Sequence, residues 1–297
     1  MEGQLTFLGT GTSMGVPTLG CDCAVCASTD PRDRRLRPSV LVRWMEPDGK
    51  IGGFPPFPHK KAEGMEHGSV AGSETANGTG RERVVVIDTG PDFREQALRN
   101  GLTRVDAVFY THSHADHILG LDDLRPLSFT VFREGGSIPL YASPETATVL
   151  ERIYDYTFSP LSTYPNRARV RLEPLAERNT VHGVEFLRVP VMHGEQAIAG
   201  FRFGRTAYLT DVSAIPESSF ALLEGLDCLI VSALRHKPHP SHASVDQAVR
   251  WARRIGARQT WFTHIAHELG HEMTNRLLPA GVALAYDGLS LPVSLGL

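Results

Sequence analysis

The sequence predicts a layered α/β fold in which short buried strands alternate with helices. Short runs rich in branched aliphatic and aromatic residues recur along the 297-residue chain, a pattern typical of strands. Nearly all of these runs end in a polar cluster. Helical segments lie between several of them, which indicates sheets covered by helices. In such folds, ligand groups gather at strand ends.

Eight runs are expected to form strands and three segments to form helices. The strands are predicted at residues 4–8, 39–44, 83–87, 107–110, 183–189, 207–209, 227–231 and 259–262. The helices are predicted at residues 93–100, at 244–255, and from near 266 to before 279. Ser244 can cap the second helix and Gly256 supplies its C-terminal stop, as Gly101 does for the first.

The segment 47–81 interrupts this pattern. It is rich in Gly, Pro, Ser, Glu and Lys and almost lacks branched aliphatic residues. We therefore expect a disordered insertion between two strands. A mobile lid over the site is the alternative, although the low-complexity run 68–80 offers few side chains that could hold a substrate.

Composition and charge narrow the classes of partner. No stretch reaches the roughly 18 consecutive apolar residues of a membrane span, and residues 1–4 lack the basic and apolar regions of a signal peptide. We therefore expect no membrane partner and a cytoplasmic location. The formal net charge of −3 provides no basic surface for long nucleic acid, so a small-molecule substrate is favoured.

One short polar segment carries the strongest chemical signal. Residues 110–120 follow a predicted strand and contain His112, His114, Asp116 and His117 in the pattern His-x-His-x-Asp-His. Alternation sends the first two side chains to the same side, and the other two follow where the chain turns. Two nitrogen ligands can therefore serve one metal ion, while an oxygen and a nitrogen serve a second ion.

Three further ligand residues stand at later strand ends, as a site for two metal ions requires. His193 follows one predicted strand, Asp211 follows the next and His264 follows the last. Asp211 can bridge two cations, because each carboxylate oxygen offers a lone pair. Alone, each residue would be interpreted as a strand-end turn residue. Together with the first motif, they indicate a site for two divalent metal ions.

This set resembles the metal ligands of the metallo-β-lactamase fold, and the resemblance spans nearly the whole chain. It implies one hydrolase domain over residues 1–297, a four-layer αββα sandwich of two mixed β-sheets flanked by helices. Within that superfamily, residues 8–17 and the spacing Cys21-x-Cys23-x-x-Cys26 resemble the PhnP-type phosphodiesterases. Those enzymes hydrolyse small cyclic phosphodiesters with two zinc or manganese ions.

The resemblance also implies how the ligands are shared. They would be His112, His114 and His193 for one Zn²⁺ or Mn²⁺ ion, Asp116, His117 and His264 for the other, and Asp211 between the two. A hydroxide that bridges the ions would attack phosphorus. Asp88, after a predicted strand, would orient a ligand histidine rather than bind metal. Its alternative interpretation is a turn residue before Gly90.

A second kind of metal site is indicated near the N-terminus. Cys21, Cys23 and Cys26 supply three soft thiolates, one short of a closed tetrahedral zinc site. Clustered thiols in a cytosolic chain favour metal over a disulfide. In the resembling family, the residue that matches His267 completes this structural Zn²⁺ site. The alternative is three buried thiols without metal.

His267 also begins the pattern His-Glu-x-x-His at residues 267–271. In zincin proteases this pattern places two zinc ligands and a general base on one helix. We expect no protease here, because Gly270 weakens the helix and His267 is better used by the thiolates.

A proton donor for the leaving group completes the predicted chemistry. His242 stands just ahead of the clearest helix, and the resembling enzymes place a substrate-binding or general-acid histidine at the matching position. A solvated loop histidine is the alternative, and His239 and His236 are weaker candidates. Asp116 and Asp211 join His242 as catalytic residues because they would hold the metals that activate water.

We therefore expect a binuclear metal-dependent hydrolase that acts on small, notably cyclic, phosphodiesters. A tRNA-processing phosphodiesterase and a thioester or lactam hydrolase of the same fold stay as alternatives, and a non-catalytic zinc-binding scaffold is more remote. The net charge of −3 disfavours the tRNA enzyme, and the seven-ligand set disfavours the scaffold. The oligomeric state is open, with a homodimer as one option.

Overall fold

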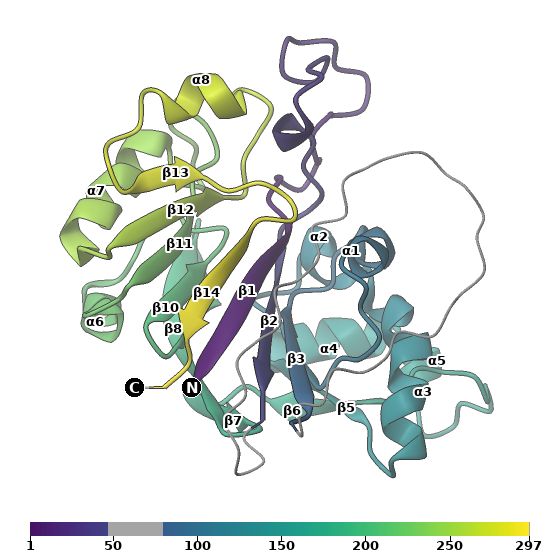
Figure 1. Cartoon of the computed structure of the whole chain (residues 1–297). Coiled ribbons are helices and arrows are strands. Elements are labelled where there is room, and N and C mark those ends of the chain that lie inside the picture. Colours follow the sequence, from purple (N-terminus) through teal and green to yellow (C-terminus); the bar gives the residue numbers. More distant parts are fainter. Residues whose placement is uncertain (47–79, 297) are drawn as a thin grey trace.

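The computed structural model describes residues 1–46 and 80–296, which form two β-sheets packed face to face with helices on their outer sides (Figure 1). The predicted insertion at 47–81 lies outside the described residues except for Gly80 and Arg81. The arrangement confirms the predicted sandwich of two mixed sheets flanked by helices. None of the described helices is both long and apolar enough to span a membrane.

The first sheet has seven strands in the order β14-β1-β2-β3-β4-β5-β6. These are β1 (Glu2–Gly9), β2 (Ser39–Met45), β3 (Glu82–Ile87), β4 (Ala107–Phe109), β5 (Ile138–Ala142), β6 (Val170–Pro174) and β14 (Ser290–Ser294). Neighbouring strands from β14 to β3 are antiparallel, and those from β3 to β6 are parallel. The carboxyl ends of β3 and β4 therefore meet at one edge.

The second sheet also has seven strands, in the order β13-β12-β11-β10-β9-β8-β7. These are β7 (Arg178–Val181), β8 (Val184–His193), β9 (Gln196–Phe203), β10 (Thr206–Leu209), β11 (Cys228–Ser232), β12 (Gln259–Thr263) and β13 (Val282–Leu284). Strands β10 to β13 are parallel, whereas β7 to β10 are antiparallel.

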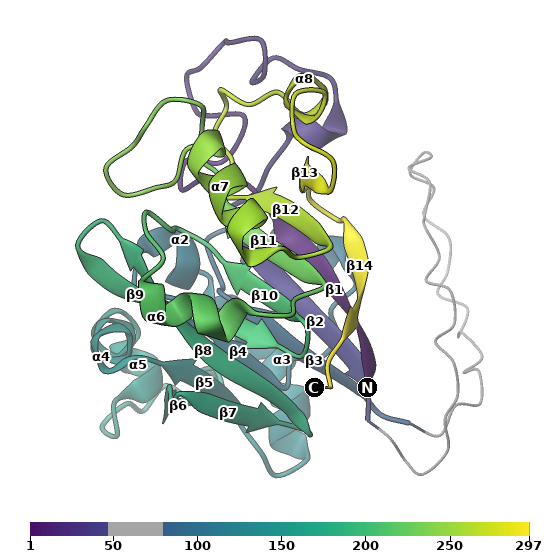
Figure 2. The same ribbon diagram turned by 90° about the vertical axis from the view of Figure 1, so that its left-hand side faces the viewer.

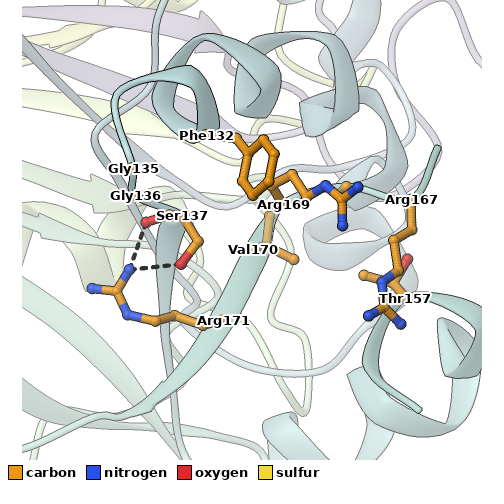
Figure 3. A pocket seen from close by; sticks show the side chains of 10 residues that line it. Phe132, Gly135, Gly136, Ser137, Thr157, Arg167, Arg169, Val170 and Arg171 are labelled. Carbon is orange, nitrogen blue, oxygen red and sulfur yellow. Dashed lines mark hydrogen bonds between the residues drawn. The ribbon is translucent and has the colours of Figure 1, made fainter. Parts of the chain in front are cut away.

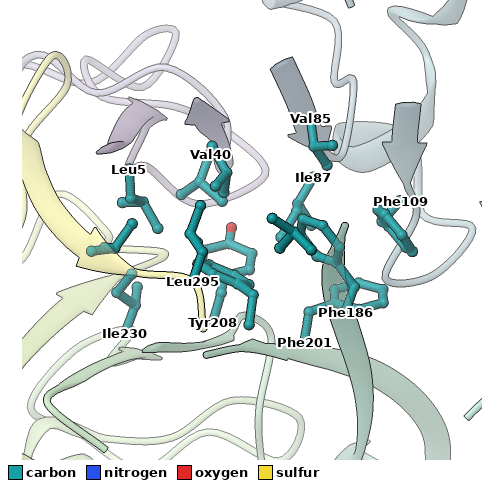
Figure 4. Packing of buried hydrophobic residues seen from close by; sticks show 14 of the residues in the cluster. Leu5, Val40, Val85, Ile87, Phe109, Phe186, Phe201, Tyr208, Ile230 and Leu295 are labelled. Atoms are coloured by element: carbon teal, nitrogen blue, oxygen red, sulfur yellow. The ribbon is translucent and has the colours of Figure 1, made fainter. Parts of the chain in front are cut away.

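The main core lies between the sheets, where strand alternation directs every second side chain inward. In β3, Val85 and Ile87 face the other sheet, while Val84 and Val86 face the outer helices. Figure 4 shows how the inner faces meet, with aliphatic side chains of the first sheet above a layer that includes Phe186, Phe201, Tyr208 and Ile230.

The outer helices bury the remaining sheet faces (Figure 2). Those on the first sheet are α1 (Phe93–Arg99), α2 (Ala115–Ile118), α3 (Arg125–Arg133), α4 (Pro144–Ile153) and α5 (Asp155–Phe158). On the second sheet lie α6 (Glu217–Phe220) and α7 (Val245–Ile255), and α8 (His271–Asn275) lies against β13.

Two of the three predicted helices are present. Ser244 caps α7 by accepting from the Gln247 backbone N–H, and Gly256 ends it with φ +70°. The third prediction was wrong in extent, because α8 begins only at His271 and residues 266–270 form a loop. In that loop the carbonyls of Ala266 and Leu269 accept hydrogen bonds from the buried guanidinium of Arg35.

All eight predicted strands are present, with ends shifted by up to four residues. The prediction missed β5, β6, β7, β9, β13 and β14, and helices α2 to α6. The missed strands are mostly edge strands or strands with polar exposed faces, where the hydrophobic alternation is weak.

Candidate metal centre

The last residue of β8, the short helix α2 and the loops that follow β4, β10 and β12 bring the sequence-predicted histidines and aspartates together at one edge of the sandwich. In the first group, each of His112, His114 and His193 offers a nitrogen, and the three nitrogens lie within 4.8 Å of one another. Their ring centroids are 4.5 to 5.4 Å apart. Three imidazoles that converge in this way form a possible nitrogen site for one divalent ion.

A second group combines two carboxylates with two imidazoles, all of them buried. Its members Asp116, His117, Asp211 and His264 also offer ligand atoms within 4.8 Å of one another. Asp211 Oδ1 lies 3.1 Å from His264 Nε2, and Asp211 Oδ2 lies 3.2 Å from His117 Nε2. A separate cluster joins Asp211 and His193 with His242, so Asp211 and His193 link the two groups.

Hydrogen bonds on the outer side of the histidines fix which nitrogen faces the centre. Asp88 Oδ2 accepts from His117 Nδ1 at 2.7 Å and from the Thr111 hydroxyl at 2.8 Å. The Thr111 hydroxyl also lies 3.0 Å from His112 Nδ1. His193 Nδ1 donates to the Ser241 carbonyl at 2.7 Å. In each case the Nε2 lone pair is left for a ligand in the centre.

Asp88 thus makes the contact that the resemblance implies, since it orients His117. Sequence reasoning missed Thr111 and Ser241. Thr111 precedes the first motif histidine, and a hydroxyl there would be a usable signal, whereas Ser241 acts through a backbone carbonyl and leaves no signal in the sequence.

Strained backbone is concentrated at this edge. Asp88, Asp211 and His264 adopt φ values of +65°, +58° and +53°, in the left-handed region that favours glycine. Each follows a strand end. Such strain persists where the surrounding structure enforces it, and it is common at functional sites.

Electrostatics in the second group are dominated by its carboxylates. Burial acts to lower the pKa of His264, but Asp211 and Asp116 raise it to about 9. Burial also acts to lower the pKa of His117, but Asp211 and Asp88 raise that pKa well above its usual value. In His112, burial and the charge of His117 lower the pKa well below its usual value. Carboxylates that attract protons so strongly also favour a divalent cation in their place.

Unpaired buried atoms support the fit of a metal ion. Among the described residues, His112 Nε2, His117 Nε2, Asp116 Oδ2 and both ring nitrogens of His264 have no hydrogen-bond partner although they are buried. An unpaired buried polar atom costs about 1–3 kcal/mol. A cation at the convergence of these lone pairs would remove that cost, so the donor set fits divalent metal.

His242 lies beside both groups. Its ring stacks on His264 at 4.8 Å with a 17° angle and lies 4.6 Å from the ring of His193. Its Nδ1 atom is 3.7 Å from Asp211 Oδ1 and is buried without a hydrogen-bond partner among the described residues. Burial and the neighbouring His264 lower the pKa of His242 to about 3. The position fits either contact with substrate or a further metal ligand, and it excludes a solvated loop histidine.

The predicted cysteine cluster is connected to this centre through His267, which follows His264 by three residues. The sulfurs of Cys21, Cys23 and Cys26 are 3.1, 3.5 and 3.4 Å from Nδ1 of His267, and the three thiols are free. Backbone N–H groups, that of Cys26 above all, lower the pKa of Cys23 to about 6. Burial raises the pKa of Cys26 to about 11. Three sulfurs and one nitrogen converging on a point match the donor set of a structural zinc site.

The same geometry excludes the zincin interpretation of residues 267–271. His267 faces the thiols, and residues 266–270 form no helix. The two histidines of that pattern therefore do not lie on one helix, as a protease of this kind requires.

Comparison with known proteins places the chain in a family. The model of the beta-lactamase superfamily domain matches residues 83–265, more than half of the chain. The chain belongs to the beta-lactamase superfamily. It is a hydrolase of the metallo-β-lactamase fold, as the sequence motifs predicted.

Three proteins that are similar to this chain have names that describe different functions. A crystal structure of a diphosphatase from the PhnP family is 48% identical, with TM-score 0.82, and covers 100% of this chain and 99% of that one. The octanoyltransferase of Porphyromonas gingivalis is 31% identical over 95% of this chain and 50% of its own length. The chain thus spans about half the length of this curated relative.

The third relative supports the fold alone. Zn²⁺-bound PqqB from Methylobacterium extorquens is 20% identical, with TM-score 0.67, and the match covers 97% of this chain and 99% of that one. The predicted family and the resemblance to PhnP-type proteins are confirmed. The roles of the individual metal ligands stay predictions.

Proposed function

We propose that this chain is a binuclear metal-dependent phosphohydrolase that cleaves small phosphodiesters, with cyclic phosphodiesters and diphosphate esters as the substrate class. The observation that carries the proposal is the convergence of three histidines and a second group of two histidines and two aspartates, linked through His193 and Asp211. The PhnP-family diphosphatase at 48% identity over the whole chain favours attack at phosphorus over attack at a carbonyl.

Two divalent ions would be held by the seven side chains described above, and zinc and manganese both suit such His and Asp ligands. When bound, they would lower the pKa of water and neutralise the charge that develops on the phosphate oxygens. Asp88, Thr111 and the Ser241 carbonyl hold the ligand histidines in one orientation before substrate arrives. Such preorganisation reduces the cost of reaching the transition state.

His242 would meet the substrate at the side of the centre formed by His193 and His264. Its unpaired Nδ1 atom can donate a hydrogen bond to a phosphate oxygen or transfer a proton to the leaving oxygen. Proton transfer requires that the bound phosphate raise the pKa of this imidazole from its low value without substrate.

A substrate panel tests the proposal. The purified, metal-loaded protein would be assayed against a ribose cyclic phosphate, a nucleotide-linked diphosphate ester, bis(p-nitrophenyl) phosphate, a precursor tRNA, an acyl thioester and a β-lactam. We expect metal-dependent turnover of the three small phosphate esters and much slower reaction of the other three compounds. Faster turnover of the thioester would replace the proposal by acyl chemistry, and preference for tRNA would replace it by RNA processing.

A further inference from the structure

A cavity of about 510 Å³ lies away from the metal centre, where α3 ends and where the chain enters β6 (Figure 3). Its walls come from the end of α3 and the turn after it, from α5, and from the segment 167–171. None of the candidate metal ligands lines it. Its volume lies within the range of small-molecule sites, about 300–1,000 Å³.

The charged side chains that line the cavity are all positive. Arg167, Arg169 and Arg171 alternate along the chain and all line the cavity, whereas no aspartate or glutamate lines it. Of these three arginines, only Arg171 forms an ion pair with another described residue, Glu173, at 2.7 Å. Arg167 and Arg169 have no carboxylate partner in that part of the chain. Guanidinium groups without a counter-ion attract phosphate, which they can bind in a bidentate manner.

Arg167 and Arg169 are held in place by neutral groups, and most of their donors are left for a ligand. Arg167 donates to the Ser159 carbonyl at 3.2 Å, and Arg169 donates to the Pro165 carbonyl at 2.9 Å. The Arg169 guanidinium also lies 4.7 Å from the ring centre of Phe132, a cation–π contact. Each guanidinium carries five N–H donors.

Unsatisfied buried atoms supply a second, independent observation. Thr157 lines the cavity and is only 7% exposed, and its hydroxyl has no hydrogen-bond partner among the described residues. Arg169 Nε is likewise buried and unpaired. Phe132, which is 52% exposed, adds apolar surface at the rim. A buried donor without a partner is unusual in a folded protein, and an oxygen acceptor bound in the cavity would satisfy both of these donors.

We propose that this cavity is a second, non-catalytic site that binds a small phosphorylated ligand of nucleotide size. The phosphate groups would contact Arg167 and Arg169, the Thr157 hydroxyl would donate to a phosphate oxygen, and an apolar ring would lie against Phe132. The proposal does not depend on the reaction at the metal centre.

Calorimetric titration with ADP tests this site, and it is run on the metal-loaded protein and on Asp211→Ala, in which binding of a diphosphate ester at the metal centre is removed. We expect ADP to bind, adenosine to bind far more weakly, and inorganic phosphate to compete with ADP. Arg167→Ala should weaken ADP binding about tenfold or more, since it removes a charged donor. The matched control is Arg205→Ala, which removes an exposed arginine that pairs with Asp227 outside the cavity. This control should bind ADP like the wild type.

Thr157→Val is the sharper variant, because it keeps the shape of the side chain and removes only the unpaired hydroxyl. It should be at least as stable as the wild type in thermal unfolding, yet bind ADP several-fold more weakly. Asp211→Ala should retain ADP binding, which separates this site from the metal centre.

Several results would overturn the proposal. These are no ADP binding at millimolar concentration, equal binding of adenosine, unchanged ADP binding in Arg167→Ala, and loss of ADP binding in Asp211→Ala alone. Arg167-dependent binding of a short RNA in place of ADP would reassign the surface to nucleic acid.

Discussion

Asp211 Oδ1 and His242 Nδ1 lie 3.7 Å apart at the candidate metal centre. Substitutions of these two residues should nevertheless have different effects. Asp211→Ala removes the residue that links the two ligand groups. We expect this variant to lose metal content and phosphodiesterase activity together, and added metal to restore little of either. Elemental analysis and turnover on the same sample measure both quantities.

His242→Ala leaves all seven proposed ligands in place, so its metal content should stay full. Its turnover of substrates with poor leaving groups should fall by roughly two to four powers of ten, the usual range for a general acid. The loss should be much smaller on nitrophenyl esters, whose leaving group hardly needs a proton. Reduced metal content would instead make His242 a ligand. His236→Ala, an exposed neighbour in the same loop, is the matched control and should behave like the wild type.

The buried carboxyl group of Asp287 should make the free energy of unfolding depend on pH. Its carboxylate accepts from the backbone N–H and hydroxyl of Thr10 at 2.9 and 2.8 Å and from the backbone N–H of Leu36 at 2.7 Å. Burial, only partly offset by these donors, raises its pKa from 3.8 to about 7. At pH values between 3.8 and about 7, Asp287 is therefore protonated in the folded state and ionised in the unfolded chain.

The stabilisation from this proton is fully present below pH 3.8 and is lost as the pH rises to about 7. Asp287→Asn does not titrate, so the wild type should exceed it in unfolding free energy by more at pH 5 than at pH 8. Denaturant unfolding of both proteins across this range measures the difference. A difference that stays constant with pH would show that the carboxyl group titrates at its ordinary value.

At the scale of elements, two glycines, Gly90 and Gly120, allow the short helix α2 to lie close against the loop that follows β3. A Cβ atom at Gly90 would overlap the carbonyl oxygen of Asp116, and one at Gly120 would overlap the carbonyl oxygen of Gly90. The backbone N–H of Thr89 donates to the His117 carbonyl at 2.8 Å. This close backbone approach positions the two α2 ligands against the rest of the centre.

Gly90→Ala should therefore displace α2, cost about 1–3 kcal/mol or more in unfolding free energy, and lower metal content and activity. Gly101→Ala is the control, because its φ of +59° makes alanine unfavourable but no atom lies within 4 Å of the added Cβ. It should lose stability and keep its metals. Equal metal content in both variants would mean that α2 can shift without disturbing the ligands.

At the scale of the whole molecule, the cysteine cluster is tied to the candidate metal centre. His267 follows His264 by three residues, and the fully buried Arg35 donates to the carbonyls of Ala266 and Leu269 in the same loop. The backbone of Arg35 pairs with Val16, which precedes the cysteines. An ion held by the cysteines and His267 would therefore stabilise the loop that carries His264.

We expect three metal ions per fully loaded chain, two exchangeable and one tightly held zinc ion. Elemental analysis after mild chelation should leave close to one zinc per chain, and Cys23→Ser should remove it and lower the melting temperature. Loss of all metal from the wild type with no change in thermal unfolding would contradict the structural zinc site.

The sequence by itself determined the fold class, the family and the candidate ligands. Periodic apolar runs ending in His, Asp and Gly are local signals, because strand alternation and turn chemistry depend on near neighbours. The pattern at residues 112–117 placed four ligand candidates together without any knowledge of the fold. The capped helix α7 could also be predicted, since both of its end signals are single residues.

Only the tertiary structure decided which distant residues meet. Contacts of Asp88 with His117, of Ser241 with His193 and of His242 with Asp211 join different loops, and no periodicity in the sequence encodes them. In the loop at 266–270, the carbonyls of Ala266 and Leu269 accept hydrogen bonds from Arg35, which lies more than 200 residues away in the sequence. The arginine-lined cavity likewise exists only because α3, α5 and β6 pack together, since a pocket is a property of packing between elements rather than of any one segment.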